Sequence, residues 1–167
     1  GGKAIAGALA NNSTLRSLYV SRNHVGVEGC EEIAGVLANN VTLTTLSIGH
    51  NQIGDRGCKA IAQALTNEST LTTLDISSNQ IGDNGYRAIA GSLVNNLTLT
   101  TLDMRYNEIG EEGCVAFADA LAANSTLTSL NFQVSNEISE EGYRILMCGL
   151  VCNKSLQKLV GCSSFTY

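Results

Sequence analysis

The sequence contains no proline, no tryptophan and only two histidines among its 167 residues. Because proline is absent, isomerisation of a native cis X-Pro bond cannot limit folding. Two histidines argue against a histidine-based metal site, and we expect no metal and no other cofactor. Long apolar runs are also missing. The longest, residues 146–152, is far shorter than the roughly 20 residues that cross a bilayer, so the sequence predicts no membrane span.

Positive charge is scarce as well. Ten Lys and Arg residues stand against fifteen Asp and Glu residues, which gives a net charge of −5. Binding to a phosphate backbone needs clustered Lys and Arg. The sequence therefore argues against a nucleic-acid partner.

What the chain does contain is a repeat in which four apolar residues and one asparagine recur at fixed places. Its consensus is LxxLxΦxxNxΦ, where Φ is an aliphatic or aromatic residue. The first leucines step by 28 residues, and a sixth unit opens 29 residues after the fifth. They are Leu15, Leu43, Leu71, Leu99, Leu127 and Leu156. Such a period predicts a solenoid in which each unit packs mainly on its neighbours.

Each unit divides into a strand, a turn and a helix. The LxxLxΦ segment alternates apolar and polar positions, as a short strand does when one face is packed. The asparagine that follows carries both a donor and an acceptor, so it can satisfy backbone groups where the chain leaves the sheet. We expect these asparagines to form a structural ladder. They are Asn23, Asn51, Asn79, Asn107 and Asn136.

A glycine-flanked turn with an acidic residue follows the ladder position, as in residues 82–85. Acid at this place is expected to cap free amides at the start of a helix. No Gly-Lys-Ser/Thr follows, which argues against a phosphate-binding loop. The helix itself is indicated by apolar residues at i, i+3, i+4 and i+7, for example Cys58, Ile61, Ala62 and Leu65.

With these motifs the chain resembles leucine-rich repeat proteins of the ribonuclease-inhibitor type, which include the sensor regions of NOD-like receptors. The uniform units also resemble repeats of bacterial effector proteins. The resemblance implies an α/β solenoid, a curved horseshoe with parallel strands on the concave side and helices on the convex side. It also implies protein recognition as the usual role. We expect residues 1–167 to form one domain of about five full repeats with partial repeats at both ends. Residues 1–9 align with residues 29–37, which suggests a fragment of a longer protein.

The candidate site lies at outward strand positions, where the units differ from one another. Asp75 and Asp103 occupy equivalent places on adjacent strands, about 5 Å apart by the usual strand spacing. Such a pair can be a solvated face, contact a protein, bind a cation or perform acid-base chemistry. Arg105, one outward position beyond Asp103, is expected to offset part of the repulsion. No nucleophile or metal ligand set accompanies the pair, so we predict no catalytic residues.

Residue types that often anchor interfaces flank the two aspartates. The predicted partner-binding stripe consists of Tyr19, Arg22, His50, Asp75, Asp103, Arg105 and Tyr106. The sequence thus favours a monomeric, non-catalytic module that binds a protein on its concave face. The alternatives are a secreted bacterial effector, the substrate-selecting region of an enzyme whose catalytic domain lies elsewhere, and a structural spacer.

The cysteines and the Asn-x-Ser/Thr strings bear on the compartment. Cys30, Cys58 and Cys114 occupy a helix position that accepts tyrosine in other units, so we expect buried thiols and a reducing compartment. Asn-x-Ser/Thr recurs in the helix-to-strand connectors, and we interpret it as structural and not as glycosylation signals. Both points favour the cytoplasm, or a host cytoplasm for an effector. Cys148 replaces residues of the outward helical face and Cys152 replaces an asparagine of the connector. The two can chelate a metal or oxidise, but no fourth ligand is evident, and a terminal unit that departs from the consensus explains them as well.

The last unit departs from the consensus. Residues 133–135 include one residue beyond the period, which predicts a bulge. Gly161 stands where an aliphatic residue is expected, and Cys162 follows it. We expect Phe165 and Tyr167 to cover the terminal core.

Overall fold

The computed structural model describes residues 1–66, 70–132 and 138–160. Within these residues, helices and strands alternate in sequence order from the first element to the last. The elements are α1 (Gly2–Ala10), β1 (Ser17–Tyr19), α2 (Gly26–Leu37), β2 (Thr45–Ser47), α3 (Gly54–Thr66), β3 (Thr73–Asp75), α4 (Asp83–Leu93), β4 (Thr101–Asp103), α5 (Glu111–Ala123), β5 (Ser129–Asn131), α6 (Glu140–Cys152) and β6 (Lys158–Val160).

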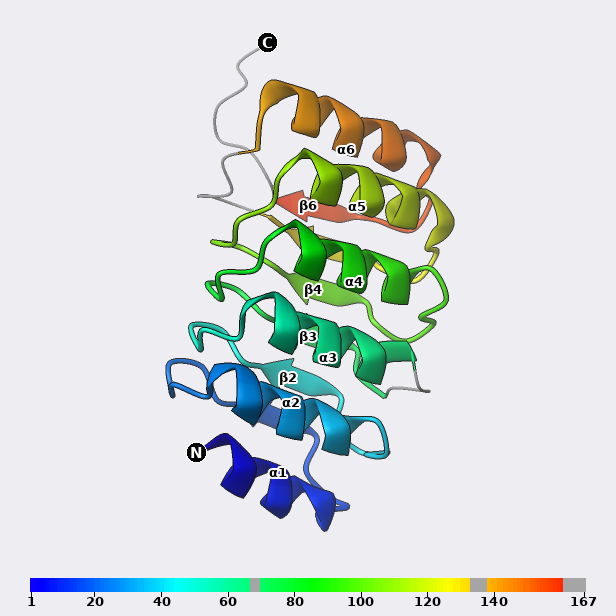
Figure 1. The fold of residues 1–167 in the computed structure, drawn as a ribbon. Coiled ribbons are helices and arrows are strands. Elements are labelled where there is room, and N and C mark those ends of the chain that lie inside the picture. The colour runs from blue at the N-terminus through cyan, green and yellow to red at the C-terminus, as the bar shows by residue number, and fades with distance from the viewer. Residues whose placement is uncertain (67–69, 133–137, 161–167) are drawn as a thin grey trace.

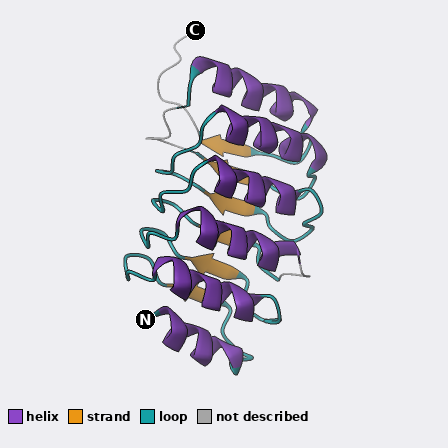
Figure 2. Ribbon diagram, in the orientation of Figure 1, coloured by secondary structure: helices purple, strands orange, loops and turns teal. Residues whose placement is uncertain are grey.

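The strands form one parallel sheet in the order β1-β2-β3-β4-β5-β6, so each strand pairs with the next one along the chain. The helices stack in a second row that covers one side of this sheet (Figures 1 and 2). The register follows the repeat, because Leu46 pairs with Leu74 and Leu74 with Leu102. The predicted α/β solenoid is therefore confirmed. We call the side formed by the strands the strand face and the opposite side the helix face.

The core lies between the two rows and is continuous from repeat to repeat. The first leucine of the inner repeats is buried, as in Leu43 and Leu71, which are each 1% exposed. Leu15 of the first unit is 36% exposed, because no preceding strand in the described residues covers it. Towards the C-terminal end the core becomes aromatic. Phe117 packs edge-on against Phe132 with ring centroids 5.1 Å apart.

The asparagine ladder forms as predicted in the inner repeats. Asn51 and Asn79 are 0% exposed and Asn107 is 1% exposed. The amide oxygen of Asn79 accepts from the backbone N–H of Asn51 at 2.8 Å, and its nitrogen donates to carbonyls of two repeats, those of Ile48 and Ile76. Asn23 is exposed at the first rung. The rung at Asn136 and the bulge predicted for residues 133–135 lie outside the described residues.

The acidic turn residues act between repeats. Asp55 Oδ1 accepts from the amides of Gly82 and Gly85 at 2.7 and 3.1 Å, and these amides begin α4 and not α3. Asp83 accepts in the same way from two amides at the start of α5. The expected capping is present, but each acid stabilises the helix of the following unit. The caps therefore also join neighbouring repeats.

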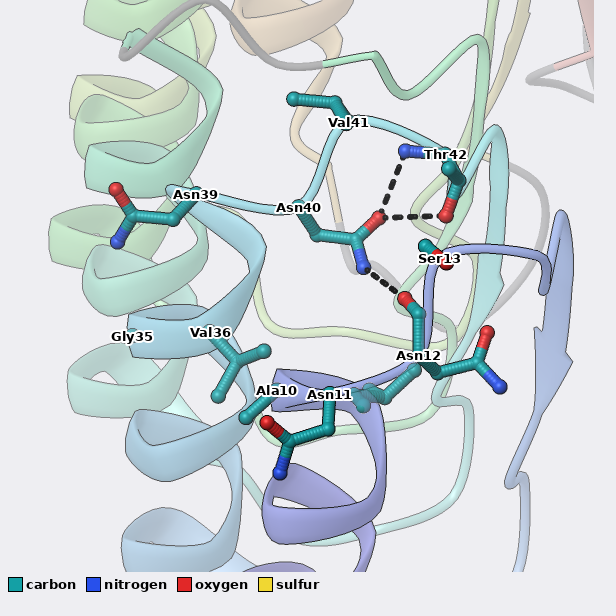
Figure 3. Close-up of a pocket in the computed structure, with 11 residues that line it drawn as sticks. Ala10, Asn11, Asn12, Ser13, Gly35, Val36, Asn39, Asn40, Val41 and Thr42 are labelled. Atoms are coloured by element: carbon teal, nitrogen blue, oxygen red, sulfur yellow. Dashed lines mark hydrogen bonds between the residues drawn. The ribbon is translucent and has the colours of Figure 1, made fainter.

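A second set of asparagines holds the helix-to-strand connectors. Asn124 Nδ2 donates to the carbonyl of Leu93 at 2.7 Å, while its Oδ1 accepts from the amides of Thr126 and Leu127. Figure 3 shows the same arrangement near the N-terminus, where Asn40 contacts Asn12 and Thr42. In the described connectors these asparagines accept hydrogen bonds from backbone amides, which agrees with a structural role for the Asn-x-Ser/Thr strings. Asn67 lies outside the described residues.

Candidate functional site

The strand face brings the predicted aspartates together. Asp75 and Asp103 are direct partners in the register of β3 and β4, as their equivalent places in the repeat predicted. Both side chains are half-buried. Tyr19 occupies the same register position on β1 and is 72% exposed. With strands about 4.8 Å apart, Tyr19 and Asp103 stand roughly 14 Å from each other across three steps.

Asp103 is neutralised within its own repeat. Arg105 Nε lies 2.9 Å from both carboxylate oxygens of Asp103, and a second guanidinium nitrogen lies 2.8 Å from Oδ2. The Arg105 backbone amide also donates to Oδ1 at 3.1 Å. The hydrogen bond to Asp103 is the main cause that raises the pKa of Arg105. Such a planar, multidentate pair holds both side chains in one geometry.

Asp75 is oriented by neutral groups instead. Its Oδ2 accepts from Ser47 Oγ at 2.6 Å, and its Oδ1 accepts from the backbone amide of Ser77 at 3.0 Å. Ser21 Oγ lies 2.8 Å from Ser47 Oγ, which extends the row across three strands. Among the described residues, the ion pairs within 4.0 Å do not involve Asp75. The two equivalent aspartates therefore differ, since Asp103 forms a direct ion pair with Arg105, whereas Asp75 interacts with that guanidinium only at longer range.

The positions between these residues are less accessible than the sequence suggested. Ser47 is 8% exposed, Ser77 is 6% exposed and Gly49 is buried, although all three occupy outward positions of the repeat. Their neighbours lie close, because Ser47 Oγ is 2.8 Å from Ser21 Oγ and 2.6 Å from Asp75 Oδ2. A Cβ added to Gly49 would lie 2.8 Å from Ser77 Oγ. We call Ser47, Gly49 and Ser77 the polar floor.

Arg22, His50 and Tyr106 lie just beyond the strands. Their φ angles are 62°, 55° and 56°, which places them in the left-handed region at the turn that leads to the ladder asparagine. This backbone is strained for residues other than glycine. It is held here by rungs between repeats, such as the amide of His50 donating to the carbonyl of Ser77 at 2.9 Å. All three residues are exposed, so they form an edge beside the polar floor.

Two surface hollows lie away from the predicted stripe. One, of about 470 Å³, is lined by connector residues of the first two repeats, including Asn12, Asn39 and Asn40 (Figure 3). Another, of about 550 Å³, lies between α2 and α3 beside Arg56 and Lys59. Sequence reasoning missed both, and Gly35, which lines each of them, is the one signal that could have indicated missing side-chain volume.

The cysteines divide as expected into buried and exposed groups. Cys30, Cys58 and Cys114 are 0% exposed. Burial raises the pKa of Cys30 to about 12 and that of Cys114 to about 11, so these thiols stay protonated at neutral pH. Cys148 and Cys152 are exposed on α6. Cys162 lies outside the described residues. Among those described, no three His, Cys, Asp or Glu side chains gather as a metal site would require.

None of the helices in the described part of the chain has the length and apolar character needed to span a membrane.

A family model described as leucine-rich repeat matches residues 11–34, 39–62, 67–90 and 95–118. No curated protein sequence matches the chain.

Solved structures share the fold at low identity. The tropomodulin C-terminal domain of Caenorhabditis elegans superposes with a TM-score of 0.74 at 13% identity, covering 91% of this chain and 92% of that one. The actin-binding site 2 of leiomodin-1 superposes with a TM-score of 0.64 at 20% identity, covering 96% of this chain and 78% of that one.

Proposed function

The chain belongs to the leucine-rich repeat family, and we propose that it is a non-catalytic module that binds a protein partner through its strand face. The buried free thiols favour a reducing compartment such as the cytoplasm for this role. The contact surface consists of Tyr19, the polar floor with Asp75, the Asp103–Arg105 pair and the exposed edge of Arg22, His50 and Tyr106.

One observation carries the proposal: exposed tyrosines stand at both sides of the polar floor, which holds an oriented carboxylate, that of Asp75, with no direct ion pair among the described residues. Tyr19 is 72% exposed and Tyr106 is 47% exposed. Tyrosine is enriched at interface hot spots, because it buries a large area at little entropic cost. Asp75 lies between them on β3 and has no cation within ion-pair distance among the described residues.

The partner chemistry follows from this arrangement. Asp75 is already fixed by two hydrogen bonds, so an incoming Lys or Arg pairs with it at little ordering cost. Asp103 offers less, because Arg105 occupies both of its oxygens. We therefore propose a partner that places a basic side chain over Asp75 and packs apolar surface on Tyr19 and Tyr106.

Actin is the first defined partner to test. The reason is the fold shared with the actin-binding site 2 of leiomodin-1 at 20% identity. Binding of purified monomeric actin to the immobilised chain is measured by interferometry. In parallel, proteins captured from cell lysate are identified by mass spectrometry and then purified for the same measurement.

The decisive variant is Tyr19→Ala with Asp75→Asn and Tyr106→Ala. Asparagine keeps an oxygen for the Ser77 amide while it removes the charge. We expect Kd to rise at least 10-fold, which corresponds to about 1.4 kcal/mol and lies below the roughly 2 kcal/mol or more that truncation of one hot-spot residue costs. The matched control is Val94→Ser with Val115→Ser, which removes apolar side chains of 44% and 46% exposure from the helix side. Loss of binding in the control alone would move the contact surface to the helix face.

A further inference from the structure

The surface hollow of about 550 Å³ between α2 and α3 lies on the helix face, and we call it the α2/α3 groove. Small residues line most of it, and one of them, Gly35, is exposed on α2. An added Cβ at Gly35 would meet no heavy atom within 4 Å, so packing inside the chain does not require glycine there. Glycine destabilises a helix relative to alanine. Gly35 therefore keeps space open above α2 at some cost in helix stability.

The two helices that flank the groove carry opposite charges at equivalent places in the repeat. Arg56 of α3 follows Glu28 of α2 by 28 residues, and Lys59 follows Glu31 by the same interval. Glu31 pairs with Arg56 across the groove at 2.9 Å, whereas Glu28 and Lys59 form no ion pair within 4.0 Å among the described residues. The remaining charged residue of α3, Asp55, is engaged with the amides that begin α4. The groove thus has an acidic side on α2 and a basic side on α3.

We propose that two copies of the chain associate through this groove as a symmetric dimer, in place of the monomer that the sequence favours. A two-fold axis along the groove exchanges α2 with α3 and keeps every residue at its level along the helix, so the same surface is used by both copies. Glu28 of one copy then meets Arg56 of the other. Glu31 meets Lys59 in the same way. Opposite charges therefore face each other on both sides of the axis.

The same axis accounts for the space above Gly35. The residue 28 positions further along the chain is Gln63, which is exposed on α3 and lines the groove. The axis places Gln63 of one copy over Gly35 of the other. A long side chain thus enters the space that glycine leaves, which gives the contact complementary shape as well as complementary charge.

The size of the contact predicts a weak dimer. Helices α2 and α3 have 12 and 13 residues, which correspond to about 18–20 Å at a rise of 1.5 Å per residue. Two such helices side by side, each about 10 Å wide, present roughly 400 Å² per copy. A total of about 800 Å² is at the low end for protein interfaces. The helices lie on the side of the sheet opposite to the strand face, so the dimer leaves the proposed partner-binding surface free (Figure 1).

Sedimentation equilibrium of the unmodified chain is the first test, over concentrations from about 1 μM to about 1 mM, the range in which a weak dimer dissociates. We expect the weight-average mass to rise from that of one chain towards that of two. The mass of one chain at every concentration would overturn the proposal and would leave the proposed function of the strand face untouched.

Charge reversals then test the symmetry of the contact. Lys59→Glu and Glu31→Lys are each expected to raise the Kd of the dimer by about 10-fold or more, because each brings like charges together on both sides of the axis. An equimolar mixture of the two variants is expected to dimerise as the unmodified chain does, since positions 59 and 31 again carry opposite charges in the mixed dimer. The matched control, Lys154→Glu, reverses an exposed charge after α6 and is expected to leave Kd unchanged. Unweakened association of either single variant, a mixture that stays monomeric, or an equal loss in the control would each contradict the proposed contact.

Discussion

Replacement of Asn79 by alanine tests whether the ladder holds the repeats together. The side chain is 0% exposed and makes contacts in both directions. Its oxygen accepts from the amide of Asn51 at 2.8 Å and from that of Ile53 at 3.5 Å. Its nitrogen donates to the carbonyls of Ile48, Ile76 and Ser77, each at 3.1 Å.

The donors and the acceptors contribute differently to the expected loss. Each of the three carbonyls keeps another donor, for example the Asn51 side chain for Ile48 and the His50 amide for Ser77. The buried amides of Asn51 and Ile53 have no other acceptor among the hydrogen bonds of the described residues, and the bond from Ile53 is the weaker one at 3.5 Å. A buried orphan donor costs about 1–3 kcal/mol, and each lost but replaceable bond costs about 0.5–1 kcal/mol. Counting the Asn51 amide as the orphan donor and the three carbonyls as replaceable partners, we expect Asn79→Ala to lower the free energy of unfolding by about 2.5–6 kcal/mol.

Asn23→Ala is the matched control, because the same residue type stands at the exposed first rung. Its oxygen accepts no hydrogen bond in the described residues, and its nitrogen donates only to the carbonyls of Val20 and Ser21. The expected cost is about 1 kcal/mol or less. Urea unfolding followed by circular dichroism gives both values by linear extrapolation. Equal losses in the two variants would refute the reasoning that satisfaction of buried backbone groups is the function of the ladder.

Two further predictions concern the caps and the thiols. Asp83→Ala removes the acceptor of two amides at the start of α5 and is expected to lower the free energy of unfolding by about 1–3 kcal/mol. The control Asn84→Ala, at an exposed position, is expected to change it by less than about 0.5 kcal/mol. Similar losses for both variants in urea unfolding would contradict the stabilising role of the Asp83 cap. Burial raises the pKa of Cys30 to about 12 from an ordinary value of 9.0, so the unfolded chain loses this thiol proton first and stability falls as pH rises above about 9. Cys30→Ala is expected to make that alkaline slope shallower by about 1.4 kcal/mol per pH unit, and an unchanged slope would show that this thiol does not contribute.

The strands, their register and the ladder could be predicted because every repeat imposes the same demand on the same position. Leu74 pairs with Leu102 for the reason that both close the same layer of core. The direction of the caps could not be predicted. Several units carry an acidic residue and two glycines at the same places in the repeat. The sequence therefore looks the same whether the acidic side chain caps the helix of its own unit or that of the next unit. Only coordinates show that Asp55 reaches α4.

The strand positions of the candidate residues could be predicted from the repeat, but their contacts could not, and their role in binding stays a prediction. The sequence placed Asp75 beside Asp103 and expected Arg105 to offset their repulsion. It could not show that Arg105 pairs with Asp103 alone, since that choice depends on rotamers and on which neighbour is within reach. Nor could it show that Ser47 is buried, because a small side chain is covered or exposed according to the strand beside it.

The burial of the polar floor also narrows what the strand face can recognise. Small-molecule sites are concave and enclose most of their ligand, but between Tyr19 and Arg105 the side chains of Ser21, Ser47 and Asp75 contact one another, and an added Cβ at Gly49 would lie 2.8 Å from Ser77 Oγ. Specific contacts therefore depend on the exposed side chains of successive strands, which are spaced about 4.8 Å apart from one strand to the next. A ligand that reaches both Tyr19 and Tyr106 must span several such steps. The surface of a folded protein is wide enough to contact Tyr19 and Tyr106 at the same time, whereas a small molecule would reach the side chains of only one or two strands. This geometry supports the proposal of a macromolecular partner whose basic side chain would meet Asp75, since Asp75 has no ion pair within 4.0 Å among the described residues.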